Sequence, residues 1–182
     1  ELFSVLKNQN EKSLYLSINS ITKTKEREKE FSFSSVYLPS KEVITTRSDN
    51  LKQNLSEIVG KKIGYQINST EGFYAKAYLP KGCIIVPFET YQAKLSALIQ
   101  GKVDYNIDDN VAVWDDPKIR IFYEFPIQFG EAIAIMYPKN SHLRDRIEPY
   151  LKYFMRSEKF YSIIRNAYGQ ETVDYFKKNL LK

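Results

Sequence analysis

Strand-like and helix-like segments alternate from residue 62 to residue 110, and this alternation restricts the possible folds more than any other feature. Short β-rich runs mark the strands, while capping side chains before the helices and Gly101 after the second helix mark helix ends. We expect strands at 62–66, 83–86 and 103–107 and helices at 71–79 and 91–100. Repeated β-α units predict an α/β fold with a parallel sheet and with ligand-binding groups at the carboxyl ends of its strands.

The segments on either side of this region indicate a second lobe. We expect strands at 13–18, 43–46 and 131–137, a short helix at residues 2–6, another after residues 108–110, and helices from residue 143 to the end. Polar breaks near 47–50 and 126–130 are candidate crossovers between the lobes. We therefore expect one lobe from residues 1–47 and 131–182 and the other from residues 48–130.

Composition excludes several classes of function. The chain has 182 residues, with 27 Lys and Arg against 22 Asp and Glu, a net charge of +5. Its basic residues are interleaved with acidic ones, as in 23–30, so we expect no nucleic-acid partner. Cys83 and His142 are each the sole residue of their type, which argues against a disulfide, a cysteine metal cluster and a histidine-based triad. We expect no catalytic residue, no metal and no cofactor, and the absence of a long apolar run argues against a membrane span.

Several passages in fixed order carry a resemblance to a known family. They are 19–22 followed by 24–27, 60–64 followed by 68–71, 79–104, 108–112, and 138–140 with the long helix after it. In this order the chain resembles the family 3 extracellular solute-binding proteins, most closely the lysine/arginine/ornithine-binding type. The resemblance implies a type II periplasmic-binding-protein-like fold, with two lobes of mainly parallel sheets joined by a double-crossover hinge.

The same resemblance implies a function and a set of partners. We expect a periplasmic or extracytoplasmic protein that binds an amino acid or a similar small polar solute. Closure of the lobes would then signal to the permease of an ABC importer or to a membrane sensor. The family begins with a strand-helix-strand unit that would precede Glu1, so we expect an incomplete first lobe and a possible dimer or segment swap. Lys25 also replaces the usual proline of the family's first ligand loop.

The resemblance assigns ligand-binding roles to residues of both lobes. Arg27 would bind the carboxylate of an amino acid through its planar guanidinium, and Thr70 would add a hydroxyl and a backbone N–H at a helix N-terminus. Asp109 would accept the ammonium group. The complete expected set is Arg27, Thr70, Asp109, Ser20, Asn19, Thr22 and Ser69.

Each of these assignments has a structural alternative. Arg27 lies in a charged run typical of a solvated surface. Thr70 and Asp109 are residue types that commonly cap helices, and Asp108 is the neighbour that we assign more readily to capping.

Two other functions stay open at the level of sequence. One is an enzyme on the same scaffold, either dehydratase-like or a regulatory domain of a peptidoglycan-cleaving protein, for which the pair Asp108 and Asp109 offers the acid or base. The other is an interaction fragment. Turnover of a prephenate-type acid or a muropeptide would indicate the enzyme, and size-exclusion chromatography would test the fragment.

Overall fold

The computed structural model describes residues 2–52, 54–112, 117–126 and 132–179, and they form two compact units. The first unit comprises Glu1–Ser40 and Gln128–Lys182, and the second comprises Lys41–Ile127. The chain therefore passes between the units twice. The first passage lies earlier than the expected break after residue 47, so the whole of strand β3, Glu42–Arg47, belongs to the second unit.

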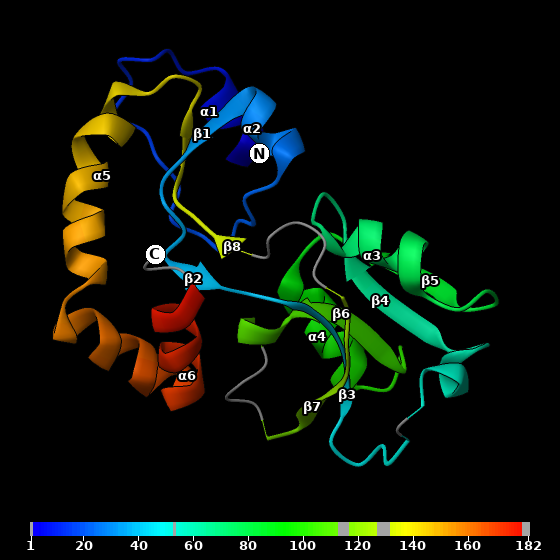
Figure 1. The fold of residues 1–182 in the computed structure, drawn as a ribbon. Coiled ribbons are helices and arrows are strands. Elements are labelled where there is room, and N and C mark those ends of the chain that lie inside the picture. The colour runs from blue at the N-terminus through cyan, green and yellow to red at the C-terminus, as the bar shows by residue number, and fades with distance from the viewer. Residues whose placement is uncertain (1, 53, 113–116, 127–131, 180–182) are drawn as a thin grey trace. The chain divides into compact units, whose positions relative to one another are not determined.

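The second unit contains a five-stranded sheet in the order β5-β4-β6-β3-β7, drawn in cyan to green in Figure 1. Its strands are β3, β4 (Lys62–Gln66), β5 (Ile84–Phe88), β6 (Tyr105–Asp109) and β7 (Ile119–Glu124). The expected parallel pairing is present where helices connect the strands, since β4 is parallel to both β5 and β6. β3 is antiparallel to β6 and to β7. No helical crossover precedes β3, so its direction is not fixed by a β-α-β connection.

Helices α3 (Glu71–Tyr78) and α4 (Tyr91–Ile99) contact this sheet. They agree with the expected helices, and for α4 local signals mark both ends. The Thr90 hydroxyl accepts a hydrogen bond from the Ala93 N–H at 3.2 Å, and Gly101 follows α4 with a φ of 71°. α4 buries Ala97 and Leu98 with Val103 and Ile119.

Gly64 allows β4 to pack closely against its neighbours. A Cβ atom at this position would lie 2.4 Å from Asn106 Oδ1, 3.0 Å from a ring carbon of Phe88 and 3.3 Å from Lys94 Cγ. We therefore expect Gly64→Ala to destabilise the protein by about 1–3 kcal/mol, measured by urea unfolding. Gly72→Ala in α3 is the control, because there the closest atom belongs to the Tyr65 ring at 3.2 Å and alanine favours a helix. A Gly64→Ala protein as stable as the wild type would contradict this packing.

The first unit contains two small antiparallel ladders. β1 (Phe31–Phe33) pairs with β9 (Met136–Pro138), and β2 (Leu38–Pro39) pairs with β8 (Ala132–Ile133). The strand expected at 131–137 is thus two short strands, with residue 131 outside the described part. The strand expected at 13–18 is reduced to an isolated bridge between Ser17 and Met136. Leu14, Tyr15 and Ile18 are 59–75% exposed, so most of the large apolar side chains of this segment do not pack against the core, although Ser17 is buried.

Helices complete both units. The helices of the first unit are α1 (Leu2–Lys7), α2 (Lys25–Glu30), α5 (His142–Met155) and α6 (Glu158–Asn179). The second unit also has two short 3-10 turns, at Leu55–Ile58 and Asn110–Ala112. α6 is interrupted at Gly169, where φ is 79° and ψ is 168°. The helix expected after residues 108–110 is represented by the 3-10 turn, and residues 113–116 lie outside the described part. Among the described helices, none combines the length and the apolar character that a membrane crossing requires.

One part of the core of the first unit lies between β1, β9 and α1. Leu6, Ile21, Phe31, Phe33, Ala134 and Met136 are buried there together, and Phe3 packs against them. The rings of Phe3 and Phe31 meet edge to face at 5.7 Å. The short helix at the start of the chain is therefore part of this core.

Candidate functional site

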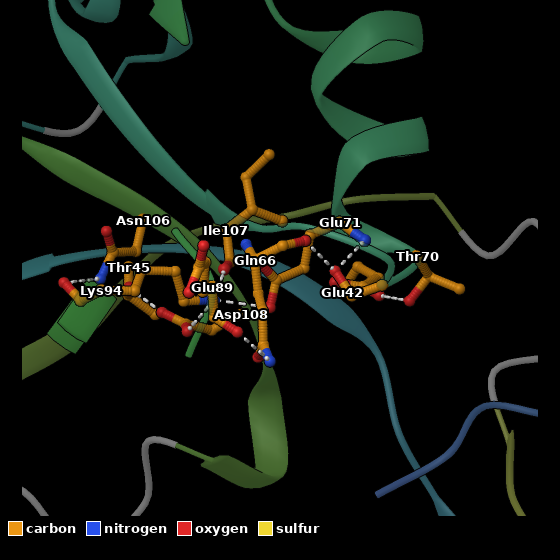
Figure 2. Close-up of polar contacts among 11 residues, drawn as sticks. Glu42, Thr45, Gln66, Thr70, Glu71, Glu89, Lys94, Asn106, Ile107 and Asp108 are labelled. Atoms are coloured by element: carbon orange, nitrogen blue, oxygen red, sulfur yellow. Dashed lines mark hydrogen bonds and ion pairs between the residues drawn. The ribbon is translucent and has the colours of Figure 1, made fainter. Parts of the chain in front are cut away.

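The carboxyl ends of β4 and β6 meet the start of β3 at one edge of the second unit's sheet. Because β3 is antiparallel to β6, Glu42 at its first position lies directly opposite Asp109 at the last position of β6. Thr70 lies at the N-terminus of α3, which follows β4. The Thr70 hydroxyl is hydrogen-bonded to Glu42 Oε1 (Figure 2). Glu42 thus connects the two residues of this unit, Thr70 and Asp109, to which the resemblance assigns the main ligand contacts.

A buried lysine lies behind this edge. Lys94 of α4 has no exposed side-chain surface, and its Nζ lies 2.5 Å from Glu71 Oε1 and 2.8 Å from Asp108 Oδ1. The same ammonium donates to the Ile107 carbonyl at 2.5 Å. The contacts with Glu71 and the Ile107 carbonyl are hydrogen bonds, and the contact with Asp108 is an ion pair. Figure 2 shows this group with the Asp108 carboxylate, which also accepts from the Thr45 hydroxyl at 2.5 Å.

Asp108 is therefore not a helix cap, contrary to our reading of the sequence. It lies within β6, is 3% exposed, and is held by Lys94 and Thr45. Asp109 lies at the end of the same strand and is only partly buried. Successive residues of a strand point to opposite faces, which explains why two adjacent aspartates have such different surroundings.

Burial raises the pKa of two glutamates in this region. Burial is the main cause of the rise of the Glu71 pKa to about 7, with a further contribution from Asp108, and Lys94 opposes the rise. The pKa of Glu42 lies well above its ordinary value, first because the group is buried and second because Asp109 is nearby. The edge thus contains two carboxyl groups that bind protons more strongly than free glutamate does.

Thr70 and Ser69 have different roles at the N-terminus of α3. Thr70 makes no side-chain cap, contrary to the capping alternative, and its hydroxyl is directed to Glu42. The Ser69 hydroxyl donates to the Gln66 carbonyl at 2.6 Å and accepts from the Glu71 N–H at 3.2 Å. Ser69 therefore shapes the turn, whereas Thr70 reaches the acidic groups.

In the first unit, Arg27 lies close to Thr22. The guanidinium Nη1 donates to the Thr22 carbonyl at 2.8 Å, and the guanidinium carbon lies 5.1 Å from the centre of the Phe3 ring. Thr24 caps α2 by accepting from the Arg27 N–H. Arg27 is half-buried, so it is not the freely solvated side chain of the structural alternative. A guanidinium held on a ring keeps its remaining N–H groups in a defined plane.

The other expected residues of the first unit lie in a tight turn. Asn19 and Ser20 are exposed, and Asn19 Oδ1 accepts from the Ser20 N–H at 2.9 Å. Thr22 is buried and bridges to Ile133. Arg27 and Thr22 therefore come together in one unit, and Thr70 and Asp109 come together around Glu42 in the other.

Sequence reasoning missed Glu42 and Lys94. Lys94 shares a helix face with the apolar Ala97 and Leu98, three and four residues later, and a lysine in such a stripe is a readable sign of a buried charge. Glu42 has no comparable sign, because its position next to Asp109 depends on the β3–β6 register. Within the described ranges, no group of three His, Cys, Asp or Glu residues is arranged to hold a metal ion.

Comparison with known proteins agrees with this fold. Residues 4–170 match the model of the bacterial extracellular solute-binding proteins, family 3. The chain belongs to this family. Its resemblance to family 3, and the type II periplasmic-binding-protein-like α/β fold which that resemblance implied, are thereby confirmed.

Two solved structures show the likeness in detail. The arginine-, lysine-, histidine-binding protein ArtJ of Geobacillus stearothermophilus is 30% identical with a TM-score of 0.78, covering 97% of this chain and 78% of that one. The substrate-binding protein AbpA of a Streptococcus pneumoniae amino acid ABC transporter, bound to L-arginine, is 25% identical with a TM-score of 0.73, covering 84% and 67%. Both are binding proteins of amino acids. A comparison with curated proteins gave no match.

Proposed function

We propose that this protein binds a basic amino acid, such as arginine, outside the cytoplasm and presents it to the permease of an ABC importer. The observation that carries the proposal is the joining of Thr70 and Asp109 around Glu42 at the ends of β4 and β6. Family membership and the arginine-binding relatives support it. In this proposal Arg27 binds the ligand carboxylate and Asp109 binds its ammonium.

The proposal includes a conformational signal. A ligand held by Arg27 of the first unit and by Asp109 of the second has a higher affinity for a closed state than for an open one, so binding favours closure. The proposal also includes supporting contacts from backbone groups. In the first unit these come from Asn19, Ser20 and Thr22, and in the second unit from Ser69 at the start of α3. Coupling to a membrane sensor instead of an importer would use the same closure.

Catalysis has no support from a specific observation. The acid-base pair suggested by the sequence was Asp108 and Asp109, and Asp108 is buried in contacts with Lys94 and Thr45. A carboxylate held in this way cannot reach a substrate proton. We therefore propose a binding function and no reaction.

Thermal unfolding with arginine tests the proposal. At an arginine concentration 100 times Kd, binding adds about 2.7 kcal/mol, and we expect Tm to rise by roughly 5–10 °C. Agmatine lacks the carboxylate and N-acetylarginine lacks the α-ammonium, so each should give a much smaller shift than arginine. The proposal fails if neither arginine nor any other common amino acid changes Tm, or if agmatine shifts it as much as arginine does.

A further inference from the structure

Glu42 is a buried acid with incomplete hydrogen bonding. It is 3% exposed, its Oε1 is bonded to Thr70, and its Oε2 is buried without a hydrogen-bond partner. Within the described residues Glu42 forms no ion pair, in contrast to Asp108 and Glu71, which share Lys94. An ionised carboxylate in such a position is costly, whereas a neutral carboxylic acid needs only one partner for its proton.

The charged groups around Glu42 favour the neutral form. β6 places Asp109 opposite it, α3 contributes Glu71, and Asp108 and Lys94 lie further along the same network. The Lys94 ammonium is already engaged by hydrogen bonds to Glu71 and the Ile107 carbonyl and by an ion pair with Asp108.

The lysine next to Glu42 in the chain does not supply a counter-charge either. Lys41 directly precedes β3 and pairs with Glu124 of β7 at 3.0 Å. The near surroundings of Glu42 are therefore acidic, and its raised pKa is consistent with them.

The protonation of Glu42 determines what the Thr70 hydroxyl can do. When Glu42 is ionised, the hydroxyl must donate its proton to Glu42 Oε1 and has none for a ligand. When Glu42 is protonated, the acid donates to Thr70 Oγ1, and the hydroxyl proton is free to point elsewhere. A ligand carboxylate beside Thr70 requires a donor and adds negative charge, and both effects favour the protonated acid.

We propose that Glu42 takes up a proton when an amino acid binds, donates it to Thr70 Oγ1, and so makes the Thr70 hydroxyl a donor to the ligand carboxylate. This inference rests on the proposed function. Glu42 is a positioning residue that acts through Thr70, and binding of the zwitterion is coupled to the uptake of one proton. The affinity of the wild type therefore falls as pH rises above the pKa of Glu42 in the ligand-free protein, with a limiting slope of about tenfold per pH unit.

Isothermal titration calorimetry with L-arginine tests this coupling, in pairs of buffers with different ionisation enthalpies, from about pH 5.5 to about pH 9.5. We expect the wild type to show buffer-dependent heat that corresponds to proton uptake at pH values above the pKa of Glu42 in the ligand-free protein, and no uptake well below that pKa. Glu42→Gln carries an amide that donates permanently to Thr70 Oγ1, so it should bind within about threefold of the wild type at low pH and without proton uptake. Glu124→Gln, a matched change at an exposed glutamate of β7, should behave as the wild type.

The results separate the inference from the function on which it rests. Heat of binding without proton uptake in the wild type overturns the inference alone, and that measurement does not depend on the folding of any variant. Proton uptake that persists in Glu42→Gln also overturns it. A Glu42→Gln protein that is folded but binds at least tenfold more weakly at every pH would show that Glu42 acts as an anion toward the ligand ammonium. Absence of any binding heat overturns the proposed function and the inference together.

Discussion

Replacement of Lys94 by methionine is expected to destabilise the protein by about 3–5 kcal/mol, because it leaves two buried carboxylates without their cation. Methionine keeps the length and the apolar stem of lysine, so the loss comes from the charge. Nζ contacts Glu71 and Asp108 at 2.5 and 2.8 Å, and both carboxyl side chains are at least nine-tenths buried. Urea unfolding of the ligand-free protein measures the effect.

The control is Lys76→Met, which removes an exposed lysine of α3. We expect a change within about 0.5 kcal/mol for this variant. Adding Glu71→Gln and Asp108→Asn to Lys94→Met should restore part of the lost stability, since the uncompensated charges are then removed. If Lys94→Met proves no more damaging than Lys76→Met, the ion network does not stabilise the second unit.

Replacement of Arg27 by alanine is expected to abolish the thermal shift caused by arginine. The guanidinium is the proposed partner of the ligand carboxylate, and loss of one member of a buried charge pair costs about 2–5 kcal/mol of binding, or roughly 30-fold to several thousand-fold in Kd. Arg27→Lys should recover only part of the affinity, because an ammonium lacks the planar pair of N–H donors. Calorimetry with arginine gives the values of Kd.

Lys25→Ala is the matched control for Arg27. It removes a cation from the same helix, but Lys25 is exposed and outside the proposed site. Arg27 also contacts Thr22 and Phe3, so the unfolding curve of Arg27→Ala without ligand must be measured alongside. Wild-type affinity in a folded Arg27→Ala protein would exclude the proposed carboxylate contact.

Local signals in the sequence were sufficient for β4, β5, β6, α3 and α4 of the second unit, whereas β7 was not predicted and β3 was assigned to the other lobe. The Thr90 cap of α4, Gly101 after α4, the Ser69 turn before α3 and the β-rich run at 62–66 each act within a few residues, so they depend little on the rest of the fold. The segment at 13–18 shows the opposite case. Its composition is typical of a strand, yet Leu14, Tyr15 and Ile18 have no surface to pack against, and the strand is not formed.

The residues of the candidate site also divide into those that a sequence motif indicates and those that only the folded chain brings together. Arg27, Thr70 and Asp109 were found from motifs that lie at fixed places in the sequence. Glu42 reaches Thr70 and Asp109 only through the antiparallel register of β3 with β6, which joins positions 67 residues apart.

Motifs in the sequence were enough to identify the family, to predict β4, β5, β6, α3 and α4, and to propose Arg27, Thr70 and Asp109 as ligand-binding residues. Tertiary structure alone decided that Asp108 is buried beside Lys94 and that Glu42 lies opposite Asp109. The two kinds of feature differ in the sequence distance over which they act. Caps, turns and apolar spacing act between near neighbours in the chain. Desolvation of a charge and the pairing of two strands depend on segments that meet only after folding.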